Sequence, residues 1–233
     1  MELELLHTGI LSVNTFIVHL VDNFVFIVDP AGSKFSYDEQ KLVDYLQEKN
    51  LVPIAVFLTH GHFDHIMGVS LLKNKWPEIK IAIHQDDADC IGSNSKEMQK
   101  KFLYSMGPAA LELLPAFVSF AEPDIILQDG ITFDKYFNSI SKNILDEFAK
   151  WKVIHTPGHT KGSVCFYNSQ NKKLISGDTI FYGTYGRTDL FGGSEVEIFN
   201  SIKKVLKLIP GDTLVYPGHD YTGFELKTLE NLF

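Results

Sequence analysis

The sequence predicts an α/β fold in which two sheets face one another and helices cover their outer faces. Each half of the chain begins with hairpin-like strands and continues into a strand and a helix. Strands and helices must bury their apolar faces against another element, and two facing sheets with outer helices satisfy both halves. No low-complexity segment or linker interrupts the chain, so we expect one domain over residues 1–233.

The first half opens with an antiparallel set of strands. Asp22 and Asn23 tolerate the left-handed backbone of a tight turn, which predicts a hairpin between the runs on either side of them. Ser36 and Glu39 have capping-box spacing, which predicts a helix that begins there and ends at about Asn50. The other elements expected in this half are strands at residues 2–7, 14–20, 24–28, 54–58 and 80–84 and a helix over residues 66–76.

The middle and the second half repeat this alternation with longer loops. Residues 86–120 have helical character and many aromatic side chains, which we interpret as packing, with the edge of a binding pocket as the alternative. Residues 134–151 form a charged stretch that also favours a helix. The later elements are strands at residues 152–155, 163–167, 173–176 and 213–216 and helices over residues 194–208 and 224–232.

Composition and charge exclude several classes of protein. The formal net charge is −8, and lysine and arginine are not concentrated in any stretch, so we expect no nucleic-acid partner. No apolar run approaches the roughly 20 residues of a membrane-spanning helix, and the acidic N-terminus does not resemble a secretory signal. We therefore expect a soluble, cytoplasmic protein with no membrane partner. Cys90 and Cys165 are expected to be buried thiols, with a disulfide between them as the alternative.

A cluster of metal-binding side chains follows the strand predicted at residues 54–58. It consists of His60, His62, Asp64 and His65, directly before an apolar helical stretch. Residues two apart in extended backbone point the same way, so His60 and His62 can converge on one ion. Asp64 and His65, at the turn into the helix, face elsewhere. This geometry predicts two metal ions.

Three further donors lie just after strand-like runs and beside glycines, namely His159, Asp178 and His219. Strand ends can reach one edge of a sheet, which allows two groups of three donors with Asp178 as a bridge. We assign His60, His62 and His159 to one ion and Asp64, His65 and His219 to the other. We interpret His155 as structural, with the support of a ligand as the alternative.

This set of donors is typical of a catalytic metal site. Each ion has at most four protein donors, all nitrogen or oxygen, which leaves positions open for solvent. We expect two divalent ions per chain and expect zinc, with iron or manganese as alternatives, because imidazole and carboxylate ligands suit all three.

Four blocks of sequence resemble the metallo-β-lactamase superfamily, and within it the glyoxalase II-like hydrolases. They are THGHFDH (59–65), HTPGHTKGS (155–163), SGDTIFYGTYGRTDLFGG (176–193) and YPGHDYTG (216–223), and Asp29-Pro30 also lies in its expected place. The resemblance runs from about residue 14 to residue 232. It implies a four-layer αββα sandwich of two mixed sheets, with the family's metal ligands at the seven residues assigned above.

The resemblance also implies an activity. It indicates hydrolysis of a small-molecule thioester of the S-2-hydroxyacylglutathione type, in which a metal-bridging hydroxide attacks the carbonyl and Asp64 and Asp178 are catalytic. The family's glutathione contacts carry over to Arg187 and Tyr221, although Arg187 could instead be a surface charge or a partner of Asp189. The C-terminal helical domain of full-length glyoxalase II, which supplies basic residues to glutathione, is expected to be absent.

Other members of the superfamily supply the alternatives. Relatives that open β-lactam rings commonly have a cysteine where Asp178 stands, so β-lactamase activity is not expected. The second candidate is a persulfide dioxygenase, which shares the GRTD loop and the PGHDY-x-G ending. That reaction uses a single iron, here held by His60, His159 and Asp178. The stretch 141–150 resembles an insertion relative to the compact members.

Overall fold

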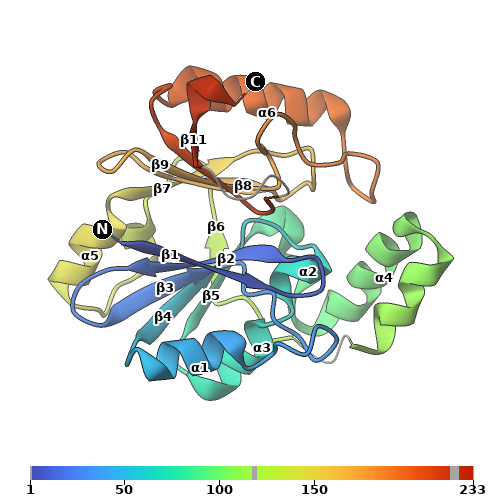
Figure 1. Cartoon of the computed structure of the whole chain (residues 1–233), viewed down its shortest axis with the longest axis horizontal. Helices are drawn as coiled ribbons and strands as arrows, with labels where there is room; N and C mark the ends of the chain where they lie inside the picture. Colours follow the sequence, from blue (N-terminus) through green and yellow to red (C-terminus); the bar gives the residue numbers. More distant parts are fainter. Residues whose placement is uncertain (1, 117–119, 221–225, 233) are drawn as a thin grey trace.

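Two mixed sheets lie face to face in the computed structural model, which describes residues 2–116, 120–220 and 226–232 (Figure 1). The first sheet contains, in spatial order, β1 (Leu3–Thr8), β2 (Val13–His19), β3 (Phe24–Val28), β4 (Val52–Phe57), β5 (Lys80–His84) and β6 (Ile125–Leu127). The second contains, in spatial order, β11 (Lys227–Thr228), β10 (Leu214–Pro217), β9 (Lys173–Gly177), β8 (Val164–Asn168) and β7 (Trp151–His155). The prediction of two facing sheets is confirmed.

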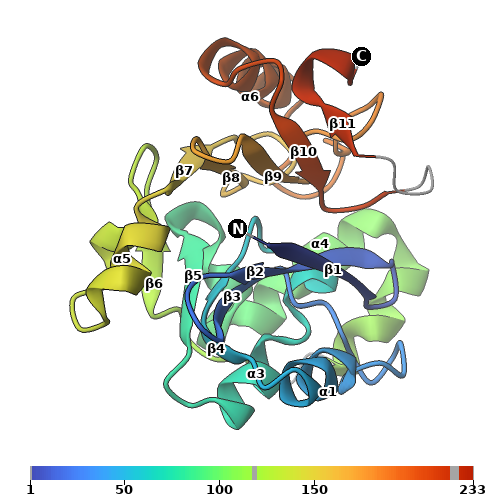
Figure 2. The ribbon, with the colours of Figure 1, turned by 60° about the vertical axis from the view of Figure 1, so that its left-hand side comes forward.

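The helices form the outer layers and one flank of the molecule. Their bounds are α1 (Lys41–Glu48), α2 (Phe63–Ile66), α3 (Val69–Lys75), α4 (Ser95–Met106), α5 (Lys142–Phe148) and α6 (Glu195–Leu208). The 3₁₀ segments are η1 (Gln85–Cys90), η2 (Gly92–Asn94), η3 (Pro108–Ala116), η4 (Phe133–Tyr136) and η5 (Leu229–Asn231). Figures 1 and 2 show α1 and α3 outside the first sheet, α6 outside the second, and α4 beside the first sheet.

Both sheets combine parallel and antiparallel pairs. In the first sheet β1, β2 and β3 pair antiparallel, and β3 to β6 pair parallel. In the second sheet β9 and β10 are parallel and the other pairs are antiparallel. The hairpin between β2 and β3 contains Asp22 with a φ of +53°, as its turn chemistry predicts. The four-layer αββα architecture therefore follows the expected order.

Aromatic side chains fill the space between the two sheets. Phe57 of β4 stacks on Phe133 with a centroid distance of 3.9 Å and meets Phe166 of β8 at 5.8 Å. Phe26 of β3 meets Trp151 of β7 edge-on at 5.4 Å. Separate apolar clusters join the first sheet to α1 and α3, and the second sheet to α6. Each interface between layers thus has its own core, and the sheets are held rigidly relative to one another.

This packing brings the loops after four strands to one edge of the sandwich. Val164 of β8 donates its backbone N–H to Thr59 O at 2.8 Å, and Asn14 of β2 donates its backbone N–H to Gly218 O at 2.8 Å, so each sheet is tied directly to a loop of the other. The loops after β4, β7, β9 and β10 meet there. The candidate site lies at this edge.

The capping box predicted for the first helix is wrong. α1 begins at Lys41 with Gln40 as its N-cap and without a side-chain cap. The Ser36 hydroxyl instead donates to Ser33 O at 3.1 Å and pairs with the Asp38 carboxylate inside the preceding turn. Serine and aspartate side chains bond local backbone in turns as readily as at helix ends, so their spacing alone misplaces the helix start.

Three other helical predictions need correction. The helix expected over residues 66–76 is broken into α2 and α3 at Gly68, whose N–H donates to Pro30 O at 2.8 Å and where a side chain would contact Pro30. Of the stretch 134–151, only α5 is α-helical, and η4 precedes it. The final helix predicted over 224–232 is wrong, because residues 227–231 form β11 and η5.

Candidate metal centre

The seven predicted donors come from four loops at one edge of the sandwich. His60 and His62 follow β4, Asp64 and His65 lie in α2, and His159, Asp178 and His219 follow β7, β9 and β10. All seven side chains are buried, the most exposed being Asp178 at 8%. Polar groups are placed in an interior only where another interaction compensates for lost hydration. Buried polar side chains that converge in this way therefore need polar or charged partners close by.

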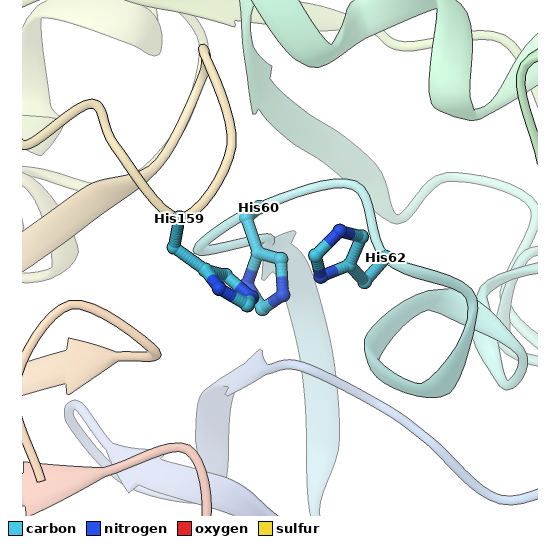
Figure 3. Close-up of side chains that lie close together, drawn as sticks. All are labelled: His60, His62 and His159. Carbon is cyan, nitrogen blue, oxygen red and sulfur yellow. The ribbon is translucent and has the colours of Figure 1, made fainter. Parts of the chain in front are cut away.

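One group consists of three histidines whose rings point toward a common centre (Figure 3). The ring centroids of His60 and His62 are 4.8 Å apart, those of His60 and His159 are 4.7 Å apart, and those of His62 and His159 are 4.4 Å apart. The Nε2 atoms of all three are buried and have no hydrogen-bond partner among the described residues. Each therefore offers a lone pair or a proton to something between them.

The second group consists of Asp64, His65 and His219. His219 Nε2 lies 3.3 Å from Asp64 Oδ2 and 3.2 Å from His65 Nε2. Asp178 lies between the two groups, with its Oδ2 3.4 Å from His159 Nε2 and its Oδ1 3.5 Å from His65 Nε2. The structure thus brings the seven side chains together, with Asp178 between the two groups.

An oxygen atom holds the far side of three of these rings. His60 Nδ1 lies 3.0 Å from Thr59 Oγ1, His159 Nδ1 lies 2.8 Å from Arg187 O, and His219 Nδ1 lies 3.1 Å from Leu11 O. Carbonyl oxygens accept hydrogen bonds, so the Nδ1 of His159 and of His219 carries the proton. This pattern leaves Nε2 as the coordinating atom and is typical of histidines that bind metals.

The electrostatics of the cluster favour neutral outer imidazoles and a cation at its centre. Burial lowers the pKa of His60 and of His62 well below the usual value, so both rings keep a free lone pair. Burial also disfavours a charged His65, but the carboxylates of Asp178, Asp64 and Asp29 outweigh it and raise the pKa to about 10. The potential that holds a proton on His65 equally attracts a metal cation.

The donor set fits divalent metal ions. Ligands about 2.1 Å from a tetrahedral ion lie about 3.4 Å from one another. The contacts of Asp178 and of the second group range from 3.2 to 3.6 Å. Within each three-residue group, the donor atoms lie within 4.8 Å of one another. A side chain on Gly218 would collide with Asp178, so the backbone approaches the cluster as predicted.

A cavity of about 360 Å³ opens onto five of the seven donors, all except His60 and His65, and we refer to it as the metal cavity. Its apolar walls come from α4 and from the loop after β9, namely Phe102, Met106, Phe181, Tyr185 and Leu190. The α4 segment thus forms a pocket edge, which was the alternative to simple packing. A larger cavity of about 730 Å³ lies beside Trp76 and Tyr136 but contains none of the seven donors. The metal cavity is therefore the candidate for substrate binding.

Of the two predicted substrate contacts, the structure describes only Arg187. Arg187 lines the metal cavity, but its Nε and Nη2 donate to the two oxygens of Asp189, each at 2.7 Å. The pairing with Asp189 was the alternative for this residue. Tyr221 lies outside the described residues. His155 stacks on His84 with centroids 4.0 Å apart and bonds Lys161 O, so it contacts no described donor of the centre.

Two buried carboxylates hold the donor loops in place, and sequence reasoning missed their roles. Asp29 accepts hydrogen bonds from Thr59 N at 2.8 Å and Thr59 Oγ1 at 2.6 Å, and it lies 2.9 Å from His65 Nδ1. Asp87 accepts from Gly61 N at 2.8 Å, Thr160 Oγ1 at 2.7 Å and Gly162 N at 2.9 Å. The motif Asp29-Pro30 was a signal for the first. Nothing local marks Asp87, because its partners are distant in sequence.

Replacing Asp87 with asparagine is expected to loosen the first histidine group. An amide can keep one acceptor but presents N–H groups to a buried donor, which costs about 1–3 kcal/mol per unpaired group. Displacement of the loops should also weaken metal binding by roughly tenfold. Urea unfolding and competition with a chelator measure these two effects, with Asp86→Asn, an exposed neighbour, as the control. An Asp87 variant that behaves like the control would contradict the role assigned to Asp87.

Two further sequence predictions concern the state of the cysteines and the presence of membrane-spanning helices. Cys90 and Cys165 are both free and buried, which confirms two thiols. None of the described helices is long and apolar enough to cross a membrane.

Comparison with known proteins agrees with the fold and the donor motifs. Probable metallo-hydrolase YqgX of Bacillus subtilis (strain 168) is 32% identical over 211 residues, covering 91% of this chain and 86% of that protein. Hydroxyacylglutathione hydrolase GloC of Haemophilus influenzae is 26% identical, covering 100% of this chain and 98% of that protein. The crystal structure of BLEG-1 B3 metallo-beta-lactamase superposes with a TM-score of 0.75 at 26% identity, covering 99% of this chain and 95% of that chain. The model of the metallo-beta-lactamase superfamily matches residues 8–219, and the chain belongs to this superfamily.

Proposed function

We propose that this chain is a metal-dependent thioester hydrolase that acts on substrates of the S-2-hydroxyacylglutathione type. The observation that carries the proposal is the convergence of seven buried donors beside the metal cavity, in which the Nε2 atoms of His60, His62 and His159 have no hydrogen-bond partner among the described residues. A relative of nearly equal length is named a hydroxyacylglutathione hydrolase, which supports this substrate class. The reaction adds water across the thioester, breaks the C–S bond and releases a carboxylic acid and a thiol.

We assign two divalent ions to the donors, with zinc as the expected metal and iron or manganese as alternatives. The first ion would be held by His60, His62 and His159, and the second by Asp64, His65 and His219. Asp178 would help to hold both ions, because its carboxylate lies near Nε2 atoms of both groups. Ions bound there would lower the pKa of bound water from 15.7 to about 7 and polarise the thioester carbonyl.

The chain's own residues position the reactants. Burial raises the pKa of Asp64, but His65 and His219 outweigh it and hold the pKa well below the usual range, so the side chain stays a carboxylate. It can therefore accept a hydrogen bond from the attacking water and orient it. Phe102, Leu190 and the other apolar walls exclude bulk water around the thioester. A thiol has a pKa of about 8.5 and leaves as a thiolate, so no separate general acid is needed.

A spectrophotometric assay tests the proposed hydrolysis. The loss of ultraviolet absorbance of S-lactoylglutathione should depend on the protein, stop when the metals are removed with a chelator, and return when zinc is added back. Asp64→Asn is expected to retain the fold and lose about a hundredfold or more in kcat, because it alters a ligand that also orients water. Hydrolysis that survives complete metal removal would contradict the proposal.

The same donor set can support two other reactions, and additional assays distinguish them from thioester hydrolysis. A persulfide dioxygenase would need one iron at His60, His159 and Asp178, and oxygen uptake with glutathione persulfide would reveal it. The completeness of the second donor group favours two ions and therefore hydrolysis. The similarity to a B3 metallo-beta-lactamase calls for a β-lactam substrate in the same panel. Oxygen uptake or β-lactam opening without thioester cleavage would replace the proposed function.

A further inference from the structure

We propose that a second cavity, next to the metal cavity, binds the carboxylate-bearing thiol part of the substrate, with Lys100 and Lys101 as its counter-charges. This cavity lies between α4 and residues 189–191 and has a volume of about 390 Å³. We refer to it as the carrier cavity. The inference rests on the proposed function in taking a thioester as substrate, and it names where the thiol part of that thioester binds.

The two cavities share walls, which lets one ligand occupy both. Leu190 lines both of them, and the ion pair of Arg187 and Asp189 has one partner in each. Phe102 faces the metal cavity and its ring lies 5.8 Å from that of Phe191, which faces the carrier cavity. A thioester with its carbonyl beside the metal donors can therefore extend its thiol part past this boundary.

A hydrogen bond joins helix α4 to the loop that carries Leu190. Phe191 donates its backbone N–H to the hydroxyl oxygen of Ser105 at 3.1 Å. The helix presents Phe102 and Met106 to the metal cavity and Lys101 and Tyr104 to the carrier cavity. One helix thus supplies walls to both cavities, with apolar side chains near the metal donors and polar ones farther out.

The charges of the carrier cavity select an anionic ligand. Arg187 is neutralised by Asp189, whose pKa the guanidinium lowers to about 2. Lys100 and Lys101 form no salt bridge with any carboxylate in the described part of the chain, although Glu97 is close in sequence. Although Glu97 lines the same cavity, two adjacent ammonium groups outside any described salt bridge favour an acidic partner in a chain with a net charge of −8.

The shape and polarity of this cavity suit a short peptide-like thiol. The Lys101 ammonium lies 5.6 Å from the centroid of the Phe191 ring, which restricts its position. The exposed rings of Tyr104 and Phe191 offer an apolar floor for the chain that links carboxylates to a thiol. Ammonium groups donate charge-assisted hydrogen bonds to carboxylates. Glutathione, with two carboxylates and a thiol, has this chemistry.

Two thioesters with the same acyl group separate this role from catalysis. S-lactoylglutathione carries the carboxylates, and the lactoyl thioester of N-acetylcysteamine has an uncharged thiol part. The double variant Lys100→Ala, Lys101→Ala is expected to raise KM for the glutathione thioester about three- to tenfold with kcat unchanged. The uncharged thioester should be unaffected. Lys96→Ala, on the same helix but outside the carrier cavity, is the matched control.

Direct binding tests the cavity independently of turnover. S-methylglutathione, a thioether that cannot be hydrolysed, should bind the metal-loaded protein in calorimetry, more weakly at high salt and more weakly in the double variant. The Lys96 variant should bind like the unaltered chain. If neither thioester is cleaved but this pattern holds, the proposed function fails and the carrier cavity stands. Absent binding, equal binding to the double variant, or equal loss with the uncharged thioester would overturn the inference.

Discussion

Replacing Asp178 with alanine is expected to abolish hydrolysis and to empty both metal positions. This carboxylate lies between the two donor groups, with Oδ2 3.4 Å from His159 Nε2 and Oδ1 3.5 Å from His65 Nε2. In the proposed dinuclear centre, its loss removes a ligand from each ion and also the charge that balances them. We expect kcat/KM for the thioester to fall by about a thousandfold or more. Metal content by elemental analysis should fall well below that of the unaltered protein.

Two comparison variants make this result specific. His62→Ala removes a ligand from one group only, so it should retain more metal and more activity than Asp178→Ala. Asp212→Ala removes an exposed carboxylate that pairs with Lys172, and it should leave metal content and rate unchanged. An Asp178 variant that keeps both metals and its full rate would remove the bridging assignment.

Replacing Asp29 with alanine is expected to destabilise the fold as well as the metal centre. This side chain, 1% exposed, bonds Thr59 through two hydrogen bonds and His65 through its Nδ1. Alanine leaves these buried donors unpaired, at about 1–3 kcal/mol each. It also places a residue that disfavours the left-handed region at a φ of +51°. The summed loss, about 4–11 kcal/mol from three donors and the backbone conformation, is a large part of the 5–15 kcal/mol that typically stabilises a domain.

Denaturant unfolding with and without metal separates the two effects of Asp29. Asp29→Asn tolerates the same backbone conformation and keeps one acceptor, so it should lose less stability. It still leaves His65 Nδ1 without a carboxylate, and metal affinity should fall by about 10- to 100-fold. Asp44→Ala, an exposed carboxylate of α1, is the control. Unfolding free energy and metal affinity equal to those of the control would contradict the role of Asp29.

The donors could be predicted from sequence because their pattern is local. His60 and His62 alternate in extended backbone, Asp64 and His65 begin a helix, and each later donor follows a strand. The two groups come together because the strands that precede the donors end at the same edge of the sandwich. By contrast, Asp87 bonds residues of two different loops, and its role depends on contacts 26 to 75 positions apart. Periodicity reports which face of an element is buried, but not what it is buried against.

Helix α4 illustrates the same limit. The aromatic residues of the stretch 86–120 favour simple packing as the interpretation. In the structure, however, Phe102 and Met106 of this helix line the metal cavity. The helix predicted over residues 224–232 was wrong for a different reason. Apolar spacing over residues 224–232 favoured a helix, but Leu214 and Val215 of β10 pair with residues 227 and 228 as a strand. Pairing with an existing sheet edge overrode local propensity.

Elemental analysis combined with anomalous scattering from crystals grown with zinc tests whether the seven donors hold two metal ions. We expect two ions per chain, each about 2.0–2.2 Å from donors of its group and both in contact with Asp178. One ion confined to His60, His159 and Asp178 would point to oxygen chemistry instead. Crystals soaked in excess cation that show no ion between these imidazoles would contradict a metal centre at this site.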